Sequence, residues 1–174
     1  QQQSVEPVVE TYMKFNSVEI HFLISNPDSE KQTIKFKAFL PEEAKPEYIM
    51  DKDGLKVDYD TNAGAYYVSG DIVLGPNETT LRKVEMKDIW VFSPEEINLM
   101  KDQSSRLLPV LSKTQFEAQG VILKNQIDTT IAGVIKKQDA SYSSPQDHIV
   151  AYRENKIAIE QVKSSLSKME DLVV

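Results

Sequence analysis

The sequence contains no cysteine, a single tryptophan and only two histidines among its 174 residues. Without cysteine the chain can form no disulfide bond, thiolate nucleophile or cysteine-ligated zinc site. The two histidines, His21 and His148, stand far apart, and neither has a metal-binding partner three or four positions away. The glycine-rich phosphate loop, the serine-hydrolase elbow and the zinc-protease motif are also missing. We therefore expect a protein that is not an enzyme and that uses no cofactor.

A long apolar run is missing too, since none approaches the roughly 18–20 residues that span a bilayer. The formal charge is −7, from 20 Lys and Arg against 27 Asp and Glu, which disfavours nucleic acid and anionic membranes as partners. We expect neither membrane insertion nor nucleic-acid binding. The start Gln1-Gln2-Gln3, without methionine, suits a processed chain or a fragment of a longer protein.

What the sequence does contain is a change of hydrophobic period near Ser93. Before this point the apolar residues alternate or come in short runs; between residues 32 and 40, for example, every second side chain is apolar. About seven such segments, separated by turn residues, predict an antiparallel β-sandwich. After Ser93, apolar residues recur at helical spacing. The sequence thus predicts an α+β protein with an N-terminal tail at 1–10, a β-sandwich at 11–92 and a helical segment at 93–174.

Three turn motifs punctuate the β half: Ser25-Asn26-Pro27, Leu40-Pro41 and Leu74-Gly75-Pro76-Asn77-Glu78-Thr79. In these motifs residues 11–92 resemble the immunoglobulin-like sandwiches common in bacterial envelope and surface proteins. The resemblance implies an immunoglobulin-like fold and, with the missing cysteines, favours a periplasmic, cell-envelope or extracellular location. A cytoplasmic location stays open, because cytosolic proteins also lack disulfides.

The helical half begins with Ser93-Pro94-Glu95-Glu96, which combines a serine cap, a proline at the first helical position and a capping-box glutamate. Its pattern predicts helices at about 94–108, 114–138 and 145–173, with Pro109 ending or kinking the first.

The last two predicted helices carry apolar residues at nearly heptad spacing and are joined by a short loop. This arrangement predicts an antiparallel coiled-coil hairpin with one preceding helix. Opposed residues should have numbers that add up to about 283, so that Val134 faces Ile149 and Ile131 faces Tyr152.

A second apolar stripe on the two helices consists of Ala118, Ile122 and Ile135 on one and Val150 and Ile157 on the other. Either the first helix or the sandwich covers this stripe, or the stripe is an interface with a second copy or another protein. Tyr142, in the polar loop between the helices, is a further candidate contact. We expect a structural or protein-interaction module in which the helices mediate assembly or position the sandwich.

The alternative function is ligand or calcium binding by the sandwich, with the helices as scaffold. It depends on a cluster of oxygen-bearing side chains: Asp51, Asp53, Asp58, Asp60 and Asn62. Asp58, Asp60 and Asn62 have the 1-3-5 spacing of a calcium loop, but the glycine and the final glutamate of an EF-hand are misplaced or missing. The other interpretation of the cluster is an acidic hairpin loop that binds no ion. An enzyme would have to use carboxylates, and no pair of them stands out.

Overall fold

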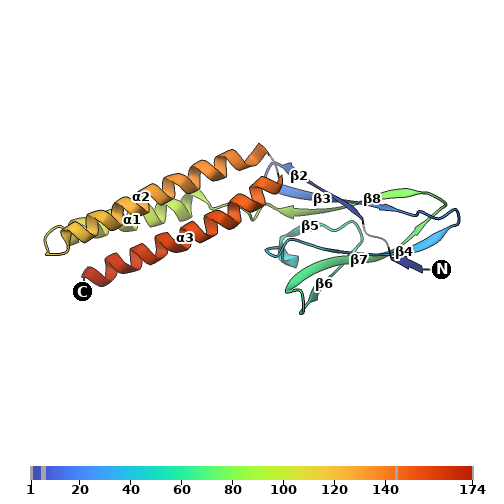
Figure 1. The fold of residues 1–174 in the computed structure, drawn as a ribbon, viewed down its shortest axis with the longest axis horizontal. Helices are drawn as coiled ribbons and strands as arrows, with labels where there is room; N and C mark the ends of the chain where they lie inside the picture. Colours follow the sequence, from blue (N-terminus) through green and yellow to red (C-terminus); the bar gives the residue numbers. More distant parts are fainter. Residues whose placement is uncertain (1, 5–6, 144, 174) are drawn as a thin grey trace. The chain divides into compact units, whose positions relative to one another are not determined.

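The computed structural model describes residues 2–4, 7–143 and 145–173, and it divides the chain into two compact units, 1–89 and 90–174. Within the described residues the first unit is made of strands and the second of helices, so the protein belongs to the α+β class (Figure 1). The order is β1 (Gln2–Ser4), β2 (Val8–Lys14), β3 (Ser17–Ser25), β4 (Gln32–Phe39), η1 (Pro46–Tyr48), β5 (Ile49–Asp51), β6 (Lys56–Asp60), β7 (Ala65–Leu74), β8 (Thr79–Lys87), α1 (Pro94–Leu111), α2 (Glu117–Ala140), η2 (Ser141–Ser143) and α3 (Pro145–Val173).

The strands form two four-stranded sheets, ordered β1-β4-β7-β6 and β2-β3-β8-β5. Neighbouring strands are antiparallel except β1 and β4, which run parallel. Alternate side chains of each sheet point inward, and the rings of Phe22 on β3 and Phe36 on β4 meet edge to face with centroids 5.2 Å apart. Both rings are almost fully buried, so the core of this unit lies between the two sheets.

Two of the turn motifs seen in the sequence meet in space. The amide of Asn26, which is 1% exposed, donates to the carbonyls of Glu30 and Gly75 at 2.8 and 2.9 Å. The backbone N–H of Asn26 donates to the carbonyl of Glu78, and the Glu78 carboxylate accepts from the N–H of Gly75. The end of β3 is therefore tied to the β7–β8 turn by one buried asparagine.

The prediction of an N-terminal tail at 1–10 is wrong. β1 pairs with β4, and β2 begins at Val8 and forms an antiparallel hairpin with β3 in which Val8 lies opposite Leu23. Strand pairing satisfies the backbone groups of this segment, which its polar composition did not indicate. The predicted boundary at residue 92 is also too late, because β8 ends at Lys87 and Trp90 is a buried residue of the helical unit.

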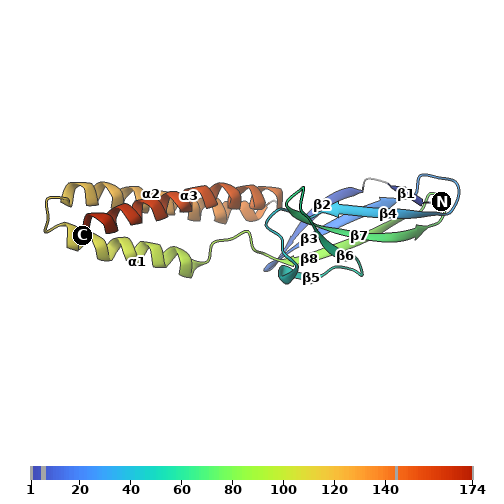
Figure 2. The ribbon, with the colours of Figure 1, turned by 90° about the horizontal axis from the view of Figure 1, so that it is seen from below.

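The helical unit is a bundle of three helices in which α1 packs on one side of the α2–α3 pair (Figure 2). Its core contains Leu111, Ile127, Ile131, Ile159 and Met169, each 2% exposed or less. The start of α1 follows the sequence, since the Ser93 hydroxyl accepts from the N–H of Glu96 at 3.2 Å. Among the described residues no helix is long and apolar enough to cross a bilayer.

Two predicted helix ends are wrong. α1 runs through Pro109 to Leu111, because burial of Leu111 in the core holds the last turn despite the missing proline N–H. α2 begins at Glu117 rather than at Thr114, whose hydroxyl donates to the Leu111 carbonyl and accepts from the N–H of Phe116. Thr114 thus stabilises the turn between the helices and does not cap the second one.

Candidate functional site

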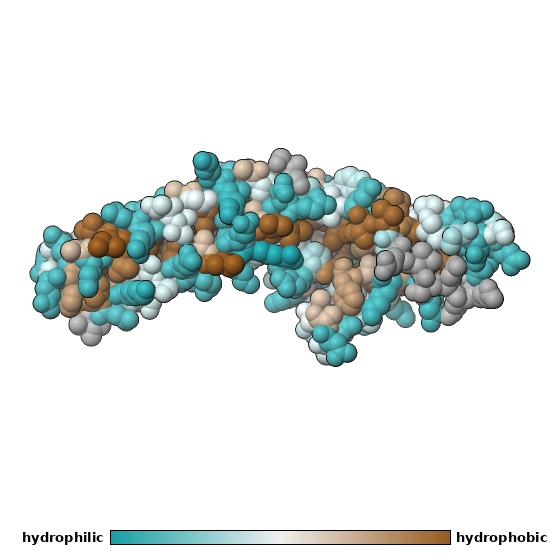
Figure 3. Space-filling view, in the orientation of Figure 1, coloured by the Kyte–Doolittle hydropathy of each residue, from teal (hydrophilic) through white to brown (hydrophobic). Residues whose placement is uncertain are grey.

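The clearest candidate for a functional surface lies on the α2–α3 pair, on the side away from α1 (Figures 1 and 2). Three of the apolar residues predicted for an interface are open to solvent here: Ile122, Val150 and Ile157 are 58, 50 and 66% exposed. Within the described part of the helical unit, neither α1 nor the other two helices cover them. Figure 3 is drawn from this side, and brown apolar atoms reach the surface along the helices.

The register of the two helices follows from their polar contacts. The Asn155 side-chain amide donates to the Val134 carbonyl at 3.1 Å, and Lys137 pairs with Glu154 at 3.3 Å. These opposed residues have numbers that add up to 289 and 291. The predicted sum of 283 is therefore wrong by six to eight residues, and Val134 lies level with Asn155 rather than with Ile149.

A shallow groove follows the seam between α2 and α3. One stretch, of about 490 Å³, is lined by Ile122, Leu123 and Gln126 on α2 and by Lys168 and Leu172 on α3, together with neighbouring side chains. A second stretch of about 310 Å³ begins at the same Gln126 and continues between Thr130 and Gln161. The two stretches share Gln126, so the groove continues along the seam.

The surface on both sides of this groove is uncharged over most of its length. Because a helix turns about 100° per residue, the residues that line the groove share a face with those three, four or seven positions away. We call this surface the α2–α3 face; it comprises Gln119, Ile122, Gln126, Thr129, Thr130 and Gly133 from α2, and Ile157, Gln161, Ser164 and Ser165 from α3. None of these residues is charged. Lys137 and Glu154 lie at one end of the face and Lys168 and Asp171 at the other, and the exposed Lys136, Arg153 and Glu160 flank it.

Gly133 is an opening in this face. A methyl group placed on its Cα would have no heavy atom of the described chain within 4 Å. Gly120, by contrast, faces α1, where such a methyl group would lie 3.0 Å from Leu111 Cδ1. The space next to the Gly120 Cα is therefore occupied by α1, whereas the space next to the Gly133 Cα is open to solvent.

The other two predicted interface residues lie elsewhere. Ile135 is 36% exposed and follows Ile122 by 13 residues, which places it about 140° away around the helix. It does not share the α2–α3 face. Tyr142 is 48% exposed in η2, and its ring packs on His148 with centroids 4.6 Å apart.

The acidic cluster is spread over two turns. Asp51 accepts from the N–H of Asp53, and Asp60 accepts from the N–H groups of Asn62 and Ala63. These hydrogen bonds, with the nearby Lys37 ammonium, lower the pKa of Asp60. The Asp58 side chain is exposed on β6. Among the described residues no three His, Asp or Glu side chains meet as a possible metal site. The carboxylates of Asp51 and Asp60 stabilise their own turns.

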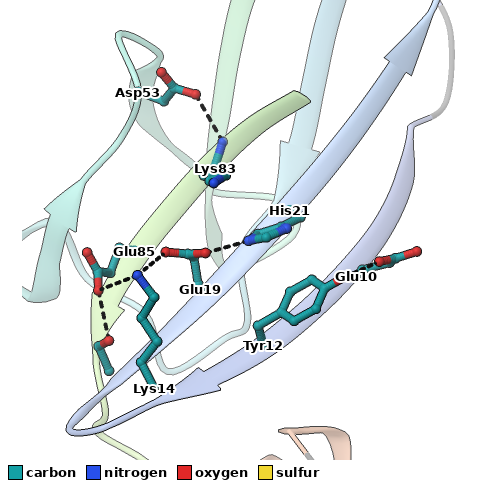
Figure 4. Close-up of polar contacts among 9 residues, drawn as sticks. Glu10, Tyr12, Lys14, Glu19, His21, Asp53, Lys83 and Glu85 are labelled. Atoms are coloured by element: carbon teal, nitrogen blue, oxygen red, sulfur yellow. Dashed lines mark hydrogen bonds and ion pairs between the residues drawn. The ribbon is translucent and has the colours of Figure 1, made fainter. Parts of the chain in front are cut away.

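The outer face of the sheet that contains β3 carries a polar network (Figure 4). Glu19 accepts from His21 Nε2 at 2.5 Å and pairs with Lys14 at 2.8 Å. Lys14 also approaches Glu85, which accepts from the Ser17 hydroxyl at 2.8 Å. The hydrogen bonds from Lys14 and His21 outweigh the burial of Glu19 and lower its pKa to about 2. This network fixes the β2–β3 hairpin and leaves His21 only slightly exposed.

The opposite sheet carries a hollow of about 530 Å³ over Ser69, with Lys35, Lys37 and Lys56 around it. Lys37 lies over the Tyr67 ring, 4.3 Å from its centroid, and 3.8 Å from Asp60. The strand register sets Lys35 opposite Asp71 and Asp58 opposite Tyr67. Three carboxylates on the same face balance the three lysines: Asp58, Asp60 and Asp71.

A serine–histidine pair escaped the sequence analysis. Ser141 Oγ and His148 Nδ1 are 2.8 Å apart, but both residues are buried, at 4 and 0% exposed. The Ser141 hydroxyl donates to the Gln138 carbonyl at 2.6 Å, so it accepts from the imidazole. A nucleophile must be reachable by its substrate, and this hydroxyl is not. The pair is a structural link between η2 and α3.

Comparison with known proteins gives no match, whether with protein-family models, with curated proteins or with solved structures.

Proposed function

We propose that this chain is a non-enzymatic assembly module in which two copies join through their α2–α3 faces. The observation that supports this proposal is the combination of exposed Ile122 and Ile157 with a stretch of groove, from Gln126 to Thr130 on α2, that no charged side chain lines. Charged side chains are normally abundant on a solvated helix face, and their depletion at the centre of a surface is typical of interfaces. An uncharged face can approach its own copy without electrostatic repulsion.

The size of the face sets the expected strength. From Gln119 to Lys137 it extends about 27 Å along α2, at roughly 1.5 Å per residue. Two helices about 10 Å wide, with axes about 8–10 Å apart, make a face about 18–20 Å wide, so its area is about 500 Å² per copy, or about 1,000 Å² in total. Stable specific interfaces bury about 1,200–2,000 Å². We therefore expect a weak dimer, with a dissociation constant in the micromolar range.

The sandwich would then be the part that each copy presents. The two packed sheets and the asparagine-linked turns support an immunoglobulin-like module. The absence of cysteine is compatible with an exported or envelope protein.

The test is the absolute mass in solution, measured by light scattering from about one to several hundred micromolar. The wild-type mass should rise toward that of two chains, and Ile157→Glu should keep the mass at one chain because it buries a charge in the interface. Leu99→Glu is the matched control, since Leu99 is 64% exposed on α1, outside the face. A wild type that stays monomeric throughout, or an Ile157→Glu variant that still dimerises, would overturn the proposal.

A further inference from the structure

We infer that the two copies are related by a twofold axis parallel to the helices, so that Ile157 of each copy packs on Gly133 of the other. This inference rests on the proposed function and adds the arrangement of the interface. In it, α2 of one copy lies antiparallel on α3 of the other, and the two α2–α3 pairs form a four-helix layer with α1 outside.

The register of α2 against α3 supports this arrangement. Contacts between α2 and α3 join residues whose numbers add up to about 290, as in Val134 with Asn155 and Lys137 with Glu154. Gly133 and Ile157 have the same sum, so they lie at the same height on neighbouring helices. A rotation about an axis parallel to the helices keeps this height and exchanges the two helices. It therefore sets Ile157 of one copy over Gly133 of the other, twice in each dimer.

The two positions are complementary in size. Ile157, at 66%, is the most exposed isoleucine on the face, and Gly133 has empty space where a side chain would begin. A branched side chain set over a glycine is a knob in a hole, the contact by which helices pack closely. Thr129, Thr130, Ser164 and Ser165 around it are short, which lets the helices approach.

Charge distinguishes this arrangement from the other twofold possibility. With the axis parallel to the helices, Lys137 of one copy lies over Glu154 of the other, and Asp171 lies over the uncharged Gln119. With the axis perpendicular to the helices and the two faces overlapping fully, α3 lies on α3 in reverse, which brings Glu154 opposite Asp171. Like charges that face each other across an interface are destabilising, so the parallel axis is favoured.

The absence of cysteine allows a direct test by disulfide cross-linking. Two single variants, Gly133→Cys and Ile157→Cys, are prepared separately, mixed at a concentration where the wild type dimerises, and oxidised. The mixture should give a disulfide-linked dimer on a non-reducing gel, and each variant alone should give little. Gly133→Cys mixed with Leu99→Cys is the control for random collision and should also give little.

A second variant tests the hole without oxidation. Gly133→Leu introduces a good helix former into α2 but fills the opening, so the dissociation constant should rise at least tenfold while the helical circular dichroism is retained. A wild-type dimer that Ile157→Glu disrupts, but whose cysteine mixture gives no more product than the collision control, would overturn the arrangement and leave the proposed function intact. A chain that is monomeric at all concentrations would refute the proposed function itself.

Discussion

The two glycines of α2, Gly120 and Gly133, should respond differently to the same substitution, with only Gly133→Ala raising the free energy of unfolding. At Gly120 an added methyl group would lie 3.0 Å from Leu111 Cδ1 and 3.3 Å from Leu111 Cβ, and Leu111 is fully buried. At Gly133 the methyl group would meet no described atom within 4 Å. Gly120→Ala and Gly133→Ala therefore share the gain in helix propensity and differ in the contact with α1.

The magnitudes can be estimated for each site. Alanine is more favourable than glycine inside a helix by about 0.8–1 kcal/mol, so Gly133→Ala should raise the free energy of unfolding by about 1 kcal/mol. Gly120→Ala has the same gain, but the crowded Leu111 must move, and overpacking of this kind costs about 1–3 kcal/mol. The variant should be neutral or up to about 2 kcal/mol less stable than the wild type. The difference between the two variants is then about 1–3 kcal/mol.

Trp90 provides the assay, because it is the only tryptophan, is 1% exposed and belongs to the helical unit. Urea denaturation followed by its fluorescence, and by far-ultraviolet circular dichroism for the helices, reports this unit. The chain should be kept at low micromolar concentration, since Gly133 lies in the proposed contact. If Gly120→Ala stabilised the protein as much as Gly133→Ala, the close packing of α1 on α2 would be refuted.

Two further substitutions probe polar contacts. Glu19→Gln should destabilise the sandwich at neutral pH by about 1–2 kcal/mol, because charge-assisted hydrogen bonds from Lys14 and His21 are weakened. The pKa of Glu19 is about 2 in the folded protein against an ordinary 4.5, so the stability that its carboxylate adds is complete above about pH 4.5 and is lost toward pH 2. Urea unfolding followed by β3 amide resonances should show the free energies of unfolding of variant and wild type converging in acid. A difference that stayed unchanged in acid would contradict the assignment to the Glu19 charge. Ser141→Ala removes the 2.8 Å hydrogen bond to His148 Nδ1 and should lower the free energy of unfolding, measured by thermal denaturation, by about 1–3 kcal/mol. Ser112→Ala, at an exposed serine, is the control and should change this free energy little. Equal effects would show that the buried pair adds no stability.

Elements with a strong local period could be predicted from the sequence. Residues 32–40 alternate, and in the structure Ile34 and Phe36 of β4 are buried while Lys35 and Lys37 are exposed. The helix cap at Ser93 depends on residues within one turn of it, so its sequence signal was sufficient. These features need no knowledge of distant segments.

Elements that depend on a distant partner could not be predicted in this way. β1 and β2 carry no clear alternation of their own, and they are strands because β4 and β3 offer hydrogen-bonding edges. The same applies to the interface stripe. Sequence spacing showed that Ile122, Ile135 and Ile157 were apolar and outside the main seam, but the position of α1 decides which of them share a face.

The α2–α3 register was predicted wrongly because two core positions of α3 are occupied by polar residues, which a hydrophobic pattern does not detect. His148 and Asn155 occupy core positions of α3 at 0 and 3% exposed, where the pattern placed Ile149 and Tyr152. They are tolerated because each has a hydrogen-bond partner, Ser141 Oγ for the imidazole and the Val134 carbonyl for the amide. A buried asparagine with one available acceptor specifies register better than leucine does, since sliding the helix would leave its amide unpaired. That register also sets Ile157 level with Gly133, so the buried Asn155 determines the shape of the face through which we propose that the copies meet.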